Sequence, residues 1–282
     1  MAGRGPVLSY SVQSVLSQTV RDLEVLIVGD GVCDATRSVI RELRAQDDRV
    51  RFFDFPEHPS RGEPNRHRVL TDEARGGIVC YLCDRDLYLP GHVERMLEVL
   101  GNADFTHTLS FDIRPDDSFR FKMEADLGRE ADRKWILRGW EVANGVPLSF
   151  AGHTMESYRR LPFGWRTTPP GRYTDIHMWE QFLAQPDCTA VSDHTPTVLY
   201  FPTYLRKGWS VEQRRAELER WSARAADQQW TAAFLLDVIE ALSEDRLRIA
   251  RNVRGWPSVL RHLTTPSNLK RTVRRIVRRL PF

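Results

Sequence analysis

Several features are missing from the chain of 282 residues, and each absence excludes a class of protein. There is no run of about 18 consecutive apolar residues, so we expect no transmembrane helix. The first residues also lack the apolar stretch of a secretory signal. Only four cysteines are present, too few for a disulfide scaffold in a chain of this length. Together these absences favour a globular protein of the reducing cytoplasm.

Acidic residues are absent from the last part of the chain. From Arg246 to Phe282 there are eleven lysines and arginines and no aspartate or glutamate, whereas the rest of the chain carries 30 basic and 38 acidic residues. Within 266–282, apolar residues recur at spacings of three and four between the basic ones. This pattern predicts a basic amphipathic helix that binds an anionic membrane surface at the inner membrane face. A basic stripe also suits nucleic acid, but the interleaved aromatic residues of single-strand binders are missing, so we favour the membrane.

Strand and helix patterns alternate through the first hundred residues. Apolar runs predict strands at 23–28, 50–55 and 78–82, and amphipathic patterns predict helices at 10–18, 34–45, 66–74 and 90–100. This alternation predicts an α/β fold with a mostly parallel, Rossmann-like sheet flanked by helices. Later segments add a long loop at 161–172, a helix at 173–183, a last strand at 195–202 and helical pattern over 210–252. We therefore predict one domain over 1–208 and a helical extension over 209–282.

Acidic residues follow two of the predicted strands at the point where each strand ends. Asp30 follows the strand at 23–28, and Asp84 and Asp86 follow the strand at 78–82. The carboxyl ends of parallel strands meet at one edge of a sheet, where open α/β sheets bind their ligands. Two acids one residue apart can hold a divalent cation, and the cation can hold a diphosphate. The alternative is that these acids only form turns, in which aspartate is common.

Four blocks of sequence, taken in order, resemble the family-2 glycosyltransferases with the GT-A fold. The blocks are S-V-L-S-Q-T at 14–19, L-E-V-L-I-V-G-D-G-V-C-D-A-T at 23–36, C-D-R-D-L-Y-L-P at 83–90, and Thr174-Asp175 before a tryptophan-containing helix. The resemblance covers roughly residues 8–205 and implies a transferase that uses a nucleotide-sugar donor.

The resemblance also implies a role for particular acids. Asp30 matches an acid that contacts the nucleoside of the donor. Asp84 and Asp86 match the acids that bind the ribose and a divalent cation (Mg²⁺ or Mn²⁺), with Asp86 the better match to the metal ligand. Asp175 matches the catalytic base that takes a proton from the acceptor hydroxyl.

The sequence departs from the family pattern at several places. The strand that usually precedes the first helix is missing, and Gly29 replaces the first acid of its block. Arg85 stands where an acid is common, which puts the dependence on a metal in question. We find no clear histidine after the last strand at the place where many relatives have a metal ligand, and Arg206 and Lys207 lie there instead. With Arg85, these two residues are candidates to bind the diphosphate of the donor directly.

Three further side chains are candidates for the acceptor site. Trp165 and Trp179 flank the expected acceptor site, and indole faces stack well on sugar rings. His153 lies in a predicted turn close by. For each residue the alternative is a structural role in the core.

These patterns lead to one functional prediction and one alternative. The prediction is an inverting, hexosyltransferase-like enzyme. It moves a sugar from a nucleotide-diphosphate donor to a hydroxyl of a glycan or a lipid-linked acceptor. The alternative is a glycosyltransferase-like protein that binds a glycan or a partner enzyme without catalysis, for which the missing strand and Arg85 argue. A nucleic-acid-binding protein acting through the basic tail is a weaker third reading.

Overall fold

The protein is described by a computed structural model, which covers residues 5–122, 126–138 and 146–263. The chain divides into two compact units, residues 1–232 and 233–282, and the residues of the candidate site all lie in the first unit.

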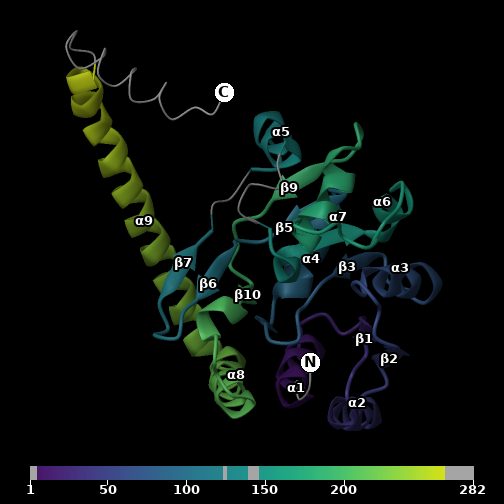
Figure 1. The fold of residues 1–282 in the computed structure, drawn as a ribbon. Helices are drawn as coiled ribbons and strands as arrows, with labels where there is room; N and C mark the ends of the chain where they lie inside the picture. The colour runs from purple at the N-terminus through teal and green to yellow at the C-terminus, as the bar shows by residue number, and fades with distance from the viewer. Residues whose placement is uncertain (1–4, 123–125, 139–145, 264–282) are drawn as a thin grey trace. The chain divides into compact units, whose positions relative to one another are not determined.

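Helices and strands alternate in the first part of the chain, as the sequence predicts (Figure 1). The elements are α1 (Gly5–Leu16), β1 (Val25–Asp30), α2 (Asp34–Gln46), β2 (Val50–Phe55), α3 (Glu63–Asp72), β3 (Ile78–Cys80), β4 (Leu87–Tyr88) and α4 (His92–Leu100). The strand predicted at 50–55 is confirmed with these ends, and the first helix begins five residues earlier than predicted.

Short strands and turns dominate the middle of the chain, before two long helices. The elements are β5 (Phe105–His107), β6 (Phe111–Ile113), β7 (Phe119–Phe121), α5 (Glu130–Arg138), the 3-10 helix η1 (Leu148–Phe150), β8 (Ala151–Thr154), α6 (Met155–Arg159), α7 (Thr174–Leu183), β9 (Ala190–Ser192), β10 (Val198–Leu199), the 3-10 helix η2 (Thr203–Arg206), α8 (Val211–Ala226) and α9 (Gln228–Leu263). The helices predicted at 173–183 and over 210–252 are confirmed.

The strands of the described residues form one four-stranded sheet and three strand pairs. The four-stranded sheet has the order β3-β8-β5-β9, in which β8 is antiparallel to both neighbours and β5 is parallel to β9. The pairs are β1-β2, which is parallel, and β4-β10 and β6-β7, which are antiparallel. Within the described part of the chain, β1 therefore pairs only with β2, and no strand joins β1 to β3.

Helix α1 and one carboxylate connect the β1-β2 pair to the four-stranded sheet. Val12 and Leu16 of α1 pack with residues of β1, and Val15 packs in the cluster that contains residues after β3. Where β1 begins, the Glu24 carboxylate accepts hydrogen bonds from the backbone N–H groups of Arg75 and Gly76, at 2.6 and 3.3 Å. The start of β1 is thus tied to the start of β3 without a backbone ladder between them.

Helices α4 and α7 lie on opposite faces of the four-stranded sheet. A Cβ added at Gly152 of β8 would meet Met96 of α4 at 3.2 Å. The next residue, His153, instead packs against Phe182 of α7 with the two rings tilted and their centroids 4.9 Å apart. Successive residues of a strand point to opposite faces, so the two helices cover the two sides. The predicted α/β class, with helices flanking the sheet and a helical C-terminal region, is confirmed.

Two expectations concern the last part of the chain. No helix in the described residues is long and apolar enough to cross a membrane. The basic tail at 266–282 lies outside the described residues, and the predicted domain boundary after residue 208 stays a prediction.

Candidate functional site

A turn between β3 and β4 carries the acid pair predicted from the sequence. The backbone N–H of Asp86 donates to the carbonyl of Cys83 at 3.1 Å, which closes the turn. Asp84 and Arg85 occupy its two central positions, and both side chains are partly exposed. Asp86 is fully buried behind them. The turn, here called the acid loop (residues 83–86), therefore presents Asp84 and Arg85 outward and Asp86 inward.

Both carboxylate oxygens of Asp86 accept hydrogen bonds from the protein. Oδ2 accepts from the hydroxyl of Ser149 at 2.5 Å, and Oδ1 accepts from the backbone N–H of Phe201 at 3.0 Å. Burial raises the pKa of this carboxyl, against the opposing influence of Arg85 and of the two donors. Asp86 thus joins the acid loop to η1 and to the segment after β10.

Asp175 is brought next to the acid loop by the same short helix η1. It lies in the first turn of α7, and its Oδ2 accepts from the backbone N–H of Leu148 at 3.0 Å. The adjacent residue, Ser149, donates to Asp86 and accepts from the backbone N–H of Cys83 at 3.1 Å. Two successive residues of η1 therefore hold the predicted base and the predicted metal ligand. Sequence reasoning missed this link because residues 112–150 show no clear period.

Asp30 lies exposed at the end of β1, where it organises a different loop. Its Oδ1 accepts from the backbone N–H of His58 at 2.8 Å and from the side-chain amide of Asn65 at 3.4 Å. Gly62 lies so close that a Cβ there would come within 2.5 Å of Oδ2 of Asp30. These contacts run to residues 58–65 and not to the acid loop.

Arg206 and Lys207, predicted to bind the diphosphate, point in different directions. The Arg206 side chain has no exposed surface, and its guanidinium holds both carboxylate oxygens of Glu217 at 2.6 to 2.9 Å. Its remaining nitrogen donates to the carbonyl of Ile113 at 3.0 Å. Lys207 is exposed. We correct the prediction for Arg206, because its guanidinium has no exposed surface and is held by Glu217, so a phosphate of the donor does not reach it.

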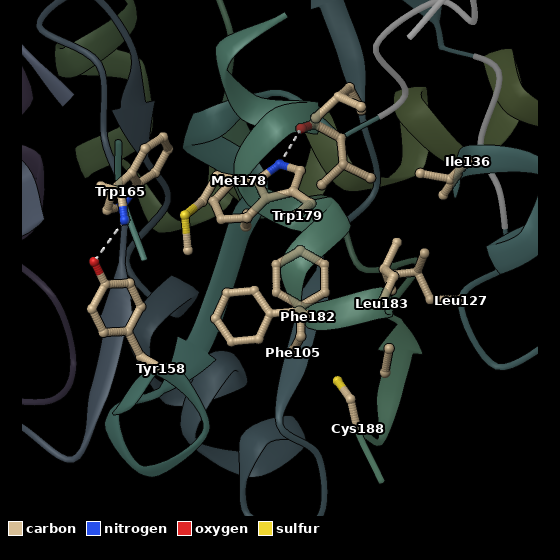
Figure 2. Close-up of a cluster of buried hydrophobic side chains, with 14 of the residues drawn as sticks. Phe105, Leu127, Ile136, Tyr158, Trp165, Met178, Trp179, Phe182, Leu183 and Cys188 are labelled. Atoms are coloured by element: carbon tan, nitrogen blue, oxygen red, sulfur yellow. Dashed lines mark hydrogen bonds between the residues drawn. The ribbon is translucent and has the colours of Figure 1, made fainter. Parts of the chain in front are cut away.

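Trp165, Trp179 and His153 belong to the core. Trp165 and Trp179 are 2% and 1% exposed, and His153 is fully buried. Figure 2 shows Trp179 packed over the ring of Phe105, with its indole N–H on a backbone carbonyl. The indole N–H of Trp165 and Nε2 of His153 both meet the hydroxyl of Tyr81, at 2.9 and 2.7 Å. We therefore do not keep these three residues in the acceptor site.

The acids of the site do not fit the ligand set of a divalent cation. Such a cation needs several carboxylate or carbonyl oxygens that reach it together. Asp86 is fully buried with both oxygens hydrogen-bonded. Asp84 lies against the guanidinium of Arg85, with 3.4 Å between Oδ1 and a terminal nitrogen. No group of three or more histidine, cysteine, aspartate or glutamate residues in the described part of the chain is placed to hold a metal.

Comparison with known proteins places these observations in a family. Residues 3–155 match the sequence model described as Glycosyl transferase family 2. A curated relative from Campylobacter jejuni, named GalNAc(5)-diNAcBac-PP-undecaprenol beta-1,3-glucosyltransferase, is 25% identical over 159 residues. The match covers 56% of this chain and 48% of the relative, so the chain spans about half the length of that protein.

Two solved structures resemble the chain in fold. A mannosyltransferase of Pyrobaculum calidifontis, solved with GDP-Man and Mn²⁺, has a TM-score of 0.51 at 14% identity over 86% of this chain and 78% of its own. Residues 1–349 of TarS of S. aureus, solved with UDP-GlcNAc, have a TM-score of 0.51 at 11% identity over 79% and 64%. Likeness at this level of identity shows the fold, which is the GT-A fold expected from the sequence.

Proposed function

Since the chain belongs to glycosyl transferase family 2, we propose that it is an inverting glycosyltransferase that uses a nucleoside-diphosphate sugar. The acceptor is a hydroxyl of a glycan or of a lipid-linked sugar. The observation that carries the proposal is the link through η1, which holds Asp175 and the acid loop side by side. A base and a leaving-group site must lie within one substrate length of each other for in-line transfer.

Asp175 is the proposed general base. The acceptor oxygen attacks the anomeric carbon while the bond from that carbon to the diphosphate oxygen breaks, and Asp175 takes the hydroxyl proton. The new bond forms on the face opposite the leaving group, so the configuration inverts. The hydrogen bond from the Leu148 amide to Oδ2 fixes the orientation of the carboxylate at the start of α7. A rigidly held carboxylate suits a base that must meet one acceptor geometry.

The donor side is proposed to include Asp84 and Arg85 on the acid loop, with Asp30 at the nucleoside. Asp84 and Arg85 are the outward-facing members of the loop. Two relatives in fold were solved with GDP-Man and UDP-GlcNAc, and the curated relative is named for transfer onto an undecaprenol-linked sugar. These names support a nucleotide-sugar donor and a lipid-linked acceptor, and they do not decide between donors.

Calorimetric titration of the full chain with UDP and GDP, with and without Mn²⁺, tests the proposal. We expect micromolar binding of one of the two nucleotides. The Asp30→Asn variant should bind that nucleotide more weakly. The Asp34→Asn variant is a matched control, because Asp34 is almost fully exposed at the start of α2, close to Asp30 in the chain, and pairs with Arg37. Failure of the parent chain to bind either nucleotide would contradict the proposed transferase activity.

The second candidate is a glycosyltransferase-like protein that binds a glycan or a partner enzyme without catalysis. The separation of the β1-β2 pair from the four-stranded sheet favours it, as does Arg85 among the acids. Such a protein would have no use for a nucleotide pocket. Binding of a glycan in the same calorimeter, with neither UDP nor GDP bound, would support this candidate over the first.

We also propose that the basic tail at 266–282 holds the protein at an anionic membrane surface. Sedimentation of the full chain with anionic vesicles, but not with neutral ones, is the expected result. The combined substitution of Arg274, Arg275 and Arg278 by glutamine should release it. Equal binding to neutral vesicles, or tail-dependent binding to DNA alone, would contradict the membrane assignment.

A further inference from the structure

Three arginines gather around the buried carboxylates behind the acid loop. Arg85 lies on the loop, and Arg206 and Arg214 come from η2 and α8. Phe201 connects Arg214 to Asp86: its backbone N–H donates to Asp86 at 3.0 Å, and its carbonyl accepts from Arg214 at 3.4 Å. The guanidinium of Arg214 is therefore one residue's backbone away from the acid loop.

Arg214 is a largely buried cation that is only partly neutralised. Its side chain is 14% exposed, and its nearest carboxylate oxygen, Oε2 of Glu217, lies 3.3 Å away. That oxygen is already held by Arg206 at 2.7 Å. Burial lowers the pKa of Arg214, and the positive charges of Arg206 and Arg85 lower it further, against the influence of Glu217. One carboxylate, that of Glu217, thus serves two guanidiniums, and the buried Asp86 is the other negative charge that acts on Arg214.

The guanidinium of Arg85, which lies on the acid loop, also has an N–H donor that the described residues do not use. Its ion pair with Asp84 is long, at 3.4 Å, and its Nε is buried without a hydrogen-bond partner among residues that the structure describes. A buried guanidinium N–H without a partner is destabilising, so such a group is stabilised by an anion that can reach it. Among the three arginines, Arg85 and Arg214 are partly exposed, whereas Arg206 has no exposed surface.

We propose that Arg85 and Arg214 bind the diphosphate of the donor directly and fill the role that a divalent cation has in a metal-dependent transferase. The inference rests on the proposed function. Planar guanidiniums donate paired hydrogen bonds to phosphate oxygens, and such charge-assisted bonds are about twice as strong as neutral ones. The pair stabilises the negative charge that grows on the diphosphate as it leaves. No acid of the loop has to bind a metal for this to happen.

The test is calorimetric titration of the full chain in EDTA with inorganic pyrophosphate, UDP, GDP and uridine. We expect pyrophosphate and one nucleotide to bind without metal. The variants Arg85→Met and Arg214→Met should each weaken that binding about tenfold or more and leave any uridine affinity unchanged. Arg215→Met is the matched control, since Arg215 is exposed on the same helix. It should bind like the parent chain.

A second variant separates the ligand role of Arg214 from a role in folding. Arg214→Lys keeps the charge but loses the planar fork, so it should fold and bind with an affinity between those of the parent chain and Arg214→Met. Circular dichroism and thermal unfolding of every variant check the fold. If Arg214→Met does not fold, a weakened affinity of Arg214→Lys in its folded state carries the test.

The outcomes distinguish the inference from the proposed function. Nucleotide binding that requires Mn²⁺ and is unaffected by both methionine variants would overturn the arginine pair and leave the transferase standing. Pyrophosphate binding that both variants weaken, with neither nucleotide bound, would keep the anion site and overturn the transferase. Absence of binding by pyrophosphate and by both nucleotides would overturn both.

Discussion

Ser149 is the residue at which the structure makes its sharpest energetic prediction. Its side chain is fully buried, donates to Asp86 at 2.5 Å and accepts from the backbone N–H of Cys83 at 3.1 Å. The substitution Ser149→Ala removes one donor from a buried carboxylate and leaves a backbone N–H without its acceptor. A hydrogen bond to a charged group contributes about 1.5–3 kcal/mol, and an orphaned buried N–H costs about 1–3 kcal/mol.

We expect Ser149→Ala to lower the free energy of unfolding by about 2–4 kcal/mol, somewhat less than the two effects together because the loop can relax. Urea unfolding followed by tryptophan fluorescence at neutral pH measures this value. Ser11→Ala is the control: Ser11 is 2% exposed, and its hydroxyl has no hydrogen-bond partner in the described ranges. Its loss should change the free energy of unfolding by less than about 0.5 kcal/mol.

Comparison of the two serine variants shows whether the hydroxyl of Ser149 stabilises the protein through its hydrogen bonds to Asp86 and Cys83. If Ser149→Ala is no more destabilising than Ser11→Ala, the hydroxyl of Ser149 does not hold Asp86. The link through η1 between the two acids would then be refuted. A large loss of stability in both variants would instead show a general sensitivity to lost side-chain volume.

Three other substitutions test the base, the buried ion pair and a buried histidine. Asp175→Asn can still accept its backbone hydrogen bond, so a sugar-transfer assay should show kcat lowered about 10²- to 10⁴-fold with nucleotide affinity unchanged; an active variant would exclude this base. Arg206→Met leaves the buried carboxylate of Glu217 with only the longer contact to Arg214 and should cost about 3–5 kcal/mol in urea unfolding, and adding Glu217→Met should recover only part of it, because Arg214 then loses its carboxylate. Burial lowers the pKa of His153 to about 4. Between about pH 6.5 and pH 4 the unfolded chain therefore binds a proton at this ring and the folded protein does not, so the free energy of unfolding should fall as the pH drops through this range. Urea unfolding at about pH 7.5 and pH 5 should show that this residue contributes a loss of ~2 kcal/mol in the free energy of unfolding. The loss should be smaller in His153→Gln and unchanged in His194→Gln, in which an exposed ring is removed. An equal loss in the two variants would contradict the assignment to His153.

The elements with strong patterns could be predicted from the sequence alone. A continuous apolar run such as 50–55 suits a buried strand, and it is β2 in the structure. The helix at 173–183 was visible from its apolar spacing, and it is α7. In both segments the local pattern and the tertiary packing require the same conformation, so the sequence is sufficient.

The short elements could not be predicted, for a physical reason. Strands β8 and β9 have four and three residues, too few for any period to show. Their conformation comes from pairing with segments far away in the chain, and η1 is equally short. Ser149 therefore carried no sequence signal, although a serine beside a buried acid is a natural partner once the fold is known.

The indole side chains show a second limit of sequence reasoning. An indole suits both a sugar ring and a hydrophobic core, and its spacing on a helix does not tell the two apart. The structure decides for Trp179 because α7 presents it to Phe105 beneath the sheet face, with centroids 5.1 Å apart. Trp165 is fixed beside it by Tyr81 and Tyr158, which accept from its indole and backbone N–H groups.

The acid loop shows why a motif of acids does not by itself define a metal site. A carboxylate can bind a cation only if its oxygens reach the place where the cation lies, and Asp86 uses both oxygens to hold Ser149 and Phe201. The charge of a leaving diphosphate still has to be balanced, and the balance must come from donors that the protein has not saturated. Arg206 is excluded by its contacts with Glu217, whereas Arg214 shares that carboxylate at a longer distance. The position of Glu217 therefore decides which of the two arginines can bind an anion. Glu217 lies three residues after Arg214 and eleven after Arg206, and its closer pairing with Arg206 is visible only in the folded chain.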